Sequence, residues 1–341
     1  MLRLTPFTYL SPTSIDAALT LLAKHGDEAQ LMGGGTDLLP NIKHRLTEPR
    51  YVVGTRSIED IKGIELLPSG ELRIGGGVSL SELEHSSVVR ERYPALAEAA
   101  SLISSPQIRR MGTLAGNIAL DVRCNYYNQS EHWRRAIGYC MKKDSEICRV
   151  APGSDRCWAV SSADTVPVLI ALDAEMLVVH RTGARWRKVA SGYRDDGLRP
   201  LTLAPGSIIA HVRIPPQERT QTVYSKLRIR MSFDFPLVGA ATSIVLAEDG
   251  TVGRARIVLT AVASHPLEVV EAEQELVGNR LTPDVIRSAG EKVFRATHPM
   301  DNTEGAIPHR KRMARVFVER ALRQIGGLEA APSAQTSKPA G

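Results

Sequence analysis

The stretch LMGGGTDLL, which runs from Leu31 to Leu39, is the part of the sequence from which the fold is most readily inferred. Two apolar residues lead into three glycines, and apolar residues resume after the polar pair Thr36 and Asp37. This order predicts a short strand followed by a tight turn. Glycines also let successive backbone N–H groups surround one anion, because no Cβ blocks its approach. The stretch is therefore a candidate phosphate-binding loop, with a plain turn as the alternative.

The common phosphate-binding fingerprints do not fit this loop. It lacks the G-x-G-x-x-G pattern of a Rossmann fold, and no Gly-Lys-Ser/Thr follows it as in a P-loop. A second candidate runs from Gly112 to Asn117, where Thr113 and Asn117 would hydrogen-bond a ligand and Gly116 would admit it. Each stretch alone is a weak signal.

Helices and strands alternate along the chain without an internal repeat. Ser14 is a suitable N-cap for a helix that ends at Gly26, and a triple glycine at 75–77 separates a strand from a helix that begins at Ser79. Further strands are expected at 51–53, 72–74, 174–180 and 185–189, with three more between 221 and 262, and further helices at 94–103, 267–276, 283–296 and 309–325. Strands followed by helices predict a separate α+β domain after about residue 215.

Composition excludes several classes of function. The 341 residues carry a net charge of +6, but basic and acidic residues are interspersed and no nucleic-acid motif is present. The apolar run 166–179 contains Asp173 and Glu175 and is too short to span a bilayer. The first residues lack the apolar core of a signal peptide, which predicts a cytoplasmic location. We expect no nucleic-acid or membrane partner.

All four cysteines, Cys124, Cys140, Cys148 and Cys157, lie in one short segment. Two disulfides, a zinc site, an iron–sulfur cluster and coincidence are the alternatives. Disulfides are disfavoured in the cytoplasm. Zinc ligands usually pair at roughly two to four residues, closer than the spacing here, whereas a [4Fe–4S] cluster held by four thiolates tolerates wider spacing. Five aromatic residues lie in or beside the segment and suit a shell that limits solvent, although they also suit the core of an ordinary loop: Tyr126, Tyr127, Trp133, Tyr139 and Trp158.

Taken in order, the motifs resemble the FAD-binding medium subunit of the molybdenum hydroxylase (xanthine dehydrogenase) family. The matching stretches are Met32 to Leu38, Ile74 to Gly77, Leu80 to Leu83 and Gln107 to Ile118. Arg110 and Ala115 depart from the usual family residues, an asparagine and a glycine. The resemblance extends from Phe7 to about Gly326.

In most of the family, the Gly-Asn-Ile motif soon leads into a stretch matched here by Ser161 to Pro167. Here the cysteine segment (residues 122–160) interrupts the two. Such an insert, with Asp121 to Gln129 at its start, is similar to that of the 4-hydroxybenzoyl-CoA reductase β subunit. That resemblance implies a [4Fe–4S] cluster with Cys124, Cys140, Cys148 and Cys157 as its ligands.

The fold implied by the resemblance is α+β. A two-part FAD-binding domain of the PCMH (vanillyl-alcohol-oxidase-like) type would comprise residues 1–57 and 58–215, with the iron–sulfur insertion at 122–160. A C-terminal domain of antiparallel sheet plus helices would occupy 216–326, and a disordered tail 327–341.

The resemblance also implies the cofactor-binding residues. The loop would surround the FAD pyrophosphate, three further residues would reach the phosphates and ribityl chain, and Lys226 would lie near the isoalloxazine and favour the reduced flavin. The full set is Leu31, Met32, Gly33, Gly34, Gly35, Thr36, Asp37, Leu38, Thr113, Gly116, Asn117, Asp164 and Lys226. No catalytic residue is expected on this chain.

The function implied is electron transfer through FAD and [4Fe–4S], from a ferredoxin-like donor towards partner subunits. These would be a molybdenum-cofactor large subunit and a [2Fe–2S] small subunit, in a dimer of heterotrimers that removes the hydroxyl of 4-hydroxybenzoyl-CoA. The alternatives are an oxidative hydroxylase of another aromatic or N-heterocyclic substrate, a stand-alone flavin oxidase, and a non-enzymatic protein stabilised by zinc.

Overall fold

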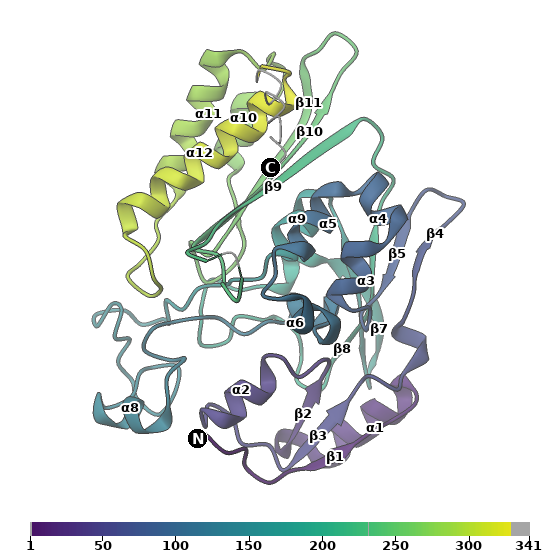
Figure 1. Cartoon of the computed structure of the whole chain (residues 1–341), viewed down its shortest axis with the longest axis vertical. Helices are drawn as coiled ribbons and strands as arrows, with labels where there is room; N and C mark the ends of the chain where they lie inside the picture. The colour runs from purple at the N-terminus through teal and green to yellow at the C-terminus, as the bar shows by residue number, and fades with distance from the viewer. Residues whose placement is uncertain (1, 231, 329–341) are drawn as a thin grey trace, which may run out of the picture.

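Three β-sheets, one after another along the chain, organise the computed structural model, which describes residues 2–230 and 232–328 (Figure 1). The first is a parallel sheet with the order β1 (Thr8–Leu10), β3 (Tyr51–Gly54), β2 (Ala29–Met32). Helix α1 (Ile15–His25) packs on it through Ala18, Leu19 and Leu22. The Oγ of Ser14 accepts the N–H of Ala17 at 3.1 Å, and Gly26 caps the other end, which confirms the predicted helix.

The second sheet is antiparallel, in the order β4 (Ile64–Leu66), β5 (Leu72–Gly75), β8 (Ile208–Ile214), β6 (Glu175–His180), β7 (Gly183–Lys188). Its main core includes Leu72, Leu96 and Leu169, all fully buried. The helices of this part are α3 (Leu80–His85), α4 (Ser87–Arg92), α5 (Pro94–Ser101), α6 (Pro106–Met111), α7 (Leu114–Ile118) and α9 (Thr165–Ala171). Short 3-10 turns occupy Gly26–Glu28, Glu59–Ile61 and Val189–Gly192.

The cysteine segment leaves this second part between α7 and α9. Its two ends are joined by paired backbone hydrogen bonds of 2.8 Å in each direction between Arg123 and Val160. Its helix α8 (Glu131–Ala136) lies beside the end of α2 (Leu38–Lys43) in Figure 1. Arg134, whose side chain is 1% exposed, fixes that position by donating to the carbonyls of His44 and Arg45.

The third sheet is antiparallel, in the order β12 (Leu267–Glu268), β11 (Val252–Thr260), β10 (Val238–Leu246), β9 (Thr220–Leu227). Alternate residues of β11 face two cores: Ile257 and Leu259 pack towards the C-terminal helices, and Val258 packs towards the main core. Those helices are α10 (Val270–Leu276), α11 (Pro283–Ala296) and α12 (Ile307–Ile325). The expected helix start near Leu267 was wrong, because β12 pairs with β11 there.

The buried side chain of Arg310 connects three loops of the C-terminal part. Its guanidinium donates to the carbonyls of Leu237, Met300 and Ala261 at 3.0, 2.8 and 2.5 Å. Burial lowers its pKa to about 10. Three loops are therefore held by one cation.

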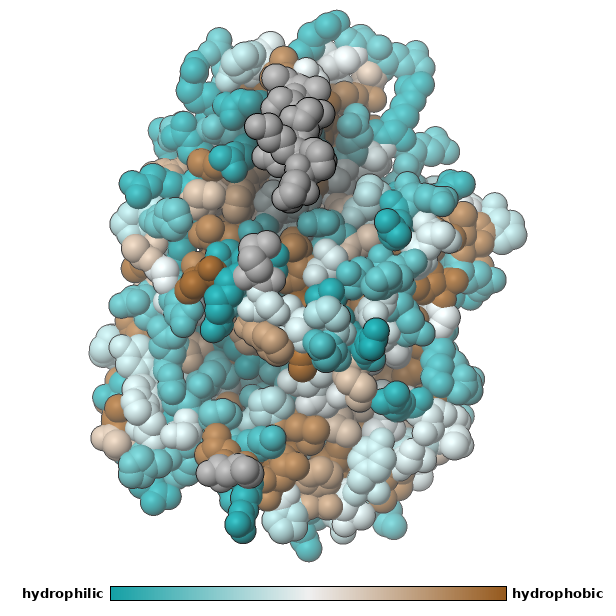
Figure 2. Space-filling view, viewed as in Figure 1, coloured by the Kyte–Doolittle hydropathy of each residue, from teal (hydrophilic) through white to brown (hydrophobic). Residues whose placement is uncertain are grey.

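The surface is mixed in character. On the face in Figure 2, apolar side chains lie in small patches among hydrophilic ones. No helix within the described residues is long and apolar enough to cross a membrane. The predicted disordered tail lies outside the described residues from 329 onward.

Candidate functional site

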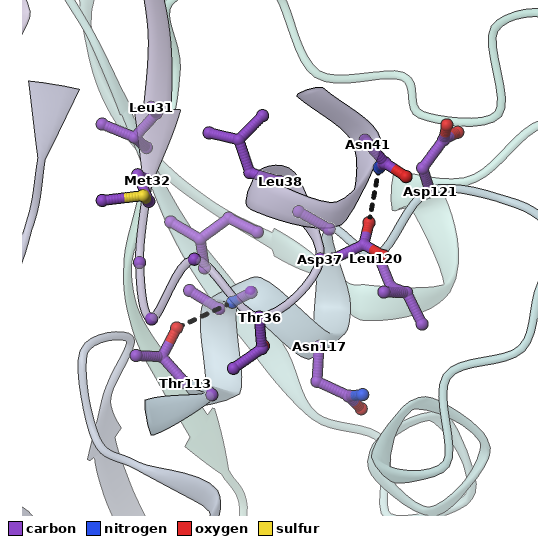
Figure 3. Close-up of a pocket in the computed structure, with 18 of the residues that line it drawn as sticks. Leu31, Met32, Thr36, Asp37, Leu38, Asn41, Thr113, Asn117, Leu120 and Asp121 are labelled. Carbon is purple, nitrogen blue, oxygen red and sulfur yellow. Dashed lines mark hydrogen bonds between the residues drawn. The ribbon is translucent and has the colours of Figure 1, made fainter. Parts of the chain in front are cut away.

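A cavity of about 920 Å³ lies where the N-terminal sheet, helix α7 and the loop between β9 and β10 meet. Figure 3 shows strand β2 leading through the glycine loop (residues 33–37) into α2, with Thr113 and Asn117 close by. All but one of the residues expected to contact FAD line this cavity: Leu31, Met32, Gly33, Gly34, Gly35, Thr36, Asp37, Leu38, Thr113, Gly116, Asn117 and Asp164. Tertiary structure thus brings together residues more than a hundred positions apart.

The glycine loop packs closely against the end of α6 and the start of α7. A Cβ on Gly34 would stand 1.7 Å from the carbonyl oxygen of Met111, and one on Gly33 would stand 2.7 Å from the Oγ1 of Thr113. Gly35 has a φ of +73°, which favours glycine. Within the described residues, the backbone N–H groups of Gly33 to Asp37 donate no hydrogen bond. They are therefore available to the oxygens of an anion.

The polar side chains of α7 play different parts. The Oγ1 of Thr113 accepts the N–H of Gly116 at 3.1 Å and so caps the helix. The Oδ1 of Asn117 accepts both the hydroxyl and the N–H of Thr165, at 2.6 and 3.2 Å. These bonds fix the Asn117 side chain at the cavity wall and leave its amide NH₂ as the donor for a ligand.

Asp164 is a buried carboxylate in the cavity wall with two strong partners behind it. Tyr224 donates its hydroxyl to one carboxylate oxygen at 2.7 Å, and Lys226 donates to the other at 2.9 Å. Burial raises the pKa of Asp164, and the Lys226 ammonium and the Tyr224 hydrogen bond oppose that rise. The carboxylate is therefore held in place from the side away from the cavity.

Lys226 lies directly behind the cavity wall. Its side chain is fully buried and is not among the residues that line the cavity. Its Nζ donates to the carbonyls of Leu102 and Asp234, at 2.9 and 3.0 Å, as well as to Asp164. All three donors of the ammonium are thus occupied, and the placement of Lys226 near the isoalloxazine stays a prediction.

Several cavity residues were missed from the sequence. Ser162 is buried in the wall and its Oγ has no partner among the described residues, which leaves it free for a ligand. Phe233 and Phe235, 62% and 47% exposed, line the cavity from the β9–β10 loop. Two of the chain's five phenylalanines stand in this one loop between strands, which is a sequence signal for an aromatic contact surface there.

The four thiols of Cys124, Cys140, Cys148 and Cys157 are free and buried, and the other three lie near enough to Cys124 to interact with it electrostatically. Burial raises the pKa of Cys124 to about 12 and that of Cys157 to about 11, and the neighbouring thiols add to both rises. Backbone N–H groups bond both sulfurs and oppose the rise. We call these four side chains the thiol cluster.

The thiol cluster does not form a preset site for one metal ion. Within residues 2–230 and 232–328, no three His, Cys, Asp or Glu side chains are placed to hold such an ion. Zinc needs its sulfurs about 2.3 Å from one centre, whereas an iron–sulfur cube holds its ligands further apart. The assignment of the four cysteines as iron ligands stays a prediction.

Comparison with protein families gives two matches that together cover most of the chain. The FAD binding domain in molybdopterin dehydrogenase matches residues 5–217, and the CO dehydrogenase flavoprotein C-terminal domain matches residues 222–325. Neither description names an iron–sulfur cluster.

Individual relatives agree with these matches. The chain is 28% identical over 320 residues to the carbon monoxide dehydrogenase medium chain of Hydrogenophaga pseudoflava, covering 93% of this chain and 96% of that one. It is also 28% identical to the aldehyde oxidoreductase FAD-binding subunit of Escherichia coli K12, covering 92% and 98%. A solved carbon monoxide dehydrogenase from Hydrogenophaga pseudoflava, lacking the Mo-pyranopterin moiety, superposes with a TM-score of 0.78 at 26% identity, covering 96% of this chain and all of that one. None of these is a 4-hydroxybenzoyl-CoA reductase, so closeness to that branch stays a prediction.

Proposed function

The chain belongs to the FAD-binding subunits of the molybdenum hydroxylase family, and we propose that it is the electron-transfer subunit of an oxidative hydroxylase. The observation that carries this proposal is the cavity, with its free backbone N–H groups and the unpartnered hydroxyl of Ser162. The relatives named as carbon monoxide dehydrogenase and aldehyde oxidoreductase favour the oxidative direction. The substrate would be an aromatic or N-heterocyclic compound bound on another subunit.

The residues of the cavity suit FAD. The N–H groups of Gly33 to Asp37 would bind the pyrophosphate, and the Asn117 amide and Ser162 hydroxyl would bind the phosphates and ribityl chain. Phe233 and Phe235 would cover an aromatic ring and exclude water. Bound FAD supplies one-electron and two-electron chemistry, which links single-electron carriers to a two-electron reaction.

The partners follow from the same proposal. A large subunit with the molybdenum cofactor and a small subunit with [2Fe–2S] clusters would assemble with this chain, as a dimer of heterotrimers. In the oxidative direction, electrons from the substrate would leave through this subunit.

A second candidate is a reductase similar to 4-hydroxybenzoyl-CoA reductase, and the thiol cluster is the observation that favours it. The fit to a [4Fe–4S] cluster rests on four buried sulfurs, the N–H groups that bond two of them, and the nearby ammonium of Lys142, which lowers the pKa of Cys157. Metal binding would displace the thiol protons. A ferredoxin-like protein would then be the donor.

One measurement tests both candidates. The full chain, purified anaerobically and separated from any accompanying subunits, is assayed for FAD, iron, acid-labile sulfide and zinc. One FAD per chain without iron supports the oxidative hydroxylase and excludes the cluster. About four iron and four sulfide with FAD supports the reductase-like candidate. Zinc without FAD would refute both, and oxidation of a substrate by the FAD-loaded chain alone, with O2 as the electron acceptor, would indicate a stand-alone oxidase.

The substrate is tested on the co-purified complex. Oxidation of aromatic or heterocyclic compounds with an artificial acceptor is compared with reduction of 4-hydroxybenzoyl-CoA by a low-potential donor. Activity in the second assay alone would overturn the oxidative proposal.

A further inference from the structure

The two ends of the cysteine segment meet where Arg123 pairs with Val160, and we call this point the neck. One side chain at the neck, that of Arg123, contacts the cavity in which FAD is proposed to bind. Arg123 sits beside Cys124, and its backbone closes the neck by pairing with Val160. Its guanidinium leaves the segment and forms an ion pair with Asp37, the last residue of the glycine loop. The two side chains are 12% and 29% exposed, so the pair is partly shielded from solvent.

The same guanidinium touches a third part of the chain. It stacks over the ring of Phe235 at 4.4 Å, in the loop between β9 and β10. Asp37 and Phe235 both line the cavity, whereas Arg123 does not. Arg123 therefore holds two walls of the cavity together from outside.

A second contact joins the two regions at the same place. The carboxylate of Asp121 lines the cavity and pairs with Lys142 of the cysteine segment at 2.9 Å. The Lys142 ammonium lies 5.0 Å from the ring of Tyr127, which lines the cavity and packs with three of the cysteines. Lys142 also donates to the carbonyl of Gly197, whose N–H bonds the Cys157 carbonyl. The cavity and the thiol cluster thus share a wall.

We propose that Arg123 is a positioning residue that couples ligand occupancy of the cavity to the order of the cysteine segment. A ligand that orders the glycine loop fixes Asp37, Asp37 fixes Arg123, and Arg123 fixes the neck beside Cys124. Coupling of this kind is reciprocal, so an ordered segment also tightens the cavity. The proposal rests on the proposed function in one respect, since it takes FAD as the ligand.

The test compares reactivity of the thiol cluster in FAD-loaded and FAD-depleted protein, using the full chain in the complex with which it purifies. Alkylation of Cys124, Cys140, Cys148 and Cys157 is followed by mass spectrometry, because this readout reports on the thiol cluster alone even when a partner subunit carries iron. Removing FAD is expected to speed the reaction about tenfold in wild type, within the usual range of coupling between sites. In Arg123→Gln the two rates are expected to be equal and fast, and the FAD dissociation constant about tenfold higher.

Three variants keep the test specific. Arg123→Lys retains the charge and is expected to recover part of the FAD dependence, which a merely destabilised fold would not do. Asp37→Asn removes the same ion pair from the other side and is used if the Arg123 variants fail to fold. Arg135→Gln, at a 72% exposed arginine of the same segment, is expected to behave as wild type.

The outcomes separate the two proposals. A chain that binds FAD but shows equal thiol reactivity with and without it overturns the coupling alone. An FAD dependence that survives in both Arg123→Gln and Asp37→Asn overturns the role of Arg123. A wild-type chain that holds no FAD overturns the proposed function and this inference with it.

Discussion

Replacing Gly34 by alanine is expected to push the glycine loop away from helix α6 and weaken FAD binding. The new Cβ would stand 1.7 Å from the carbonyl oxygen of Met111 and 2.2 Å from its carbonyl carbon. Ordinary van der Waals contact needs about 3.5 Å, so the two backbones must separate by ~1.8 Å. Neither atom belongs to a side chain that could rotate away.

The cost follows from that displacement. Overfilling a packed site costs roughly 1–3 kcal/mol. The N–H groups of the displaced loop would no longer converge on one anion. If the free energy of FAD binding becomes about 2 kcal/mol less favourable as a result, the FAD dissociation constant rises roughly 30-fold.

The assay is quenching of flavin fluorescence when FAD is added to the FAD-depleted chain, with thermal unfolding measured in parallel. Gly153→Ala is the matched control, since its Cβ would meet nothing within 4 Å and its φ is not positive. Gly34→Ala protein that binds FAD as tightly as wild type would refute the placement of FAD at this loop.

Three further substitutions test the energetics. Arg310→Ala leaves three buried carbonyls without their donor and is expected to cost about 3 kcal/mol in urea unfolding, whereas the exposed control Arg320→Ala should cost little. Lys226→Met leaves a buried carboxylate unpaired, so a loss of about 3–5 kcal/mol is expected by thermal unfolding; a loss below about 1 kcal/mol would contradict the ion pair. Burial raises the pKa of Glu273 above 4.5, so the stability it contributes is present at low pH and is lost as the pH rises through the folded-state value. Glu273→Gln should therefore be more stable than wild type at pH 7 and equal to it at pH 3, while the exposed control Glu271→Gln shows no such difference; equal stability at both pH values would show the shift to be absent.

The sequence predicted the structure correctly where contacts between residues close together in the chain determine it. The Ser14 cap, the strand that ends at Met32 and the capping box of Ser79 and Glu82 depend on residues within a few positions of each other. The same holds for Gly35, whose φ of +73° favours glycine, whereas Gly33 and Gly34 are required by contacts with Thr113 and Met111, which lie far away in the chain. The family could be inferred because several such motifs occur in a fixed order.

The candidate site was predicted less completely. The buried position of Lys226 could not be foreseen, because its three acceptors, which include the carbonyls of Leu102 and Asp234, lie far away in the chain or in a loop. Ser162 was passed over because an unpartnered hydroxyl is visible only once its surroundings are known. Phe233 and Phe235 required knowledge of where the β9–β10 loop lies.

By itself the sequence determined the local elements, the glycine turns, the α+β character and membership of the FAD-binding family. Only the tertiary structure decided that four widely spaced cysteines gather in one buried cluster and that Arg123 reaches Asp37 across the chain. The physical reason is that local propensities act over a few bonds, whereas contacts between distant residues depend on how all the sheets and helices pack together.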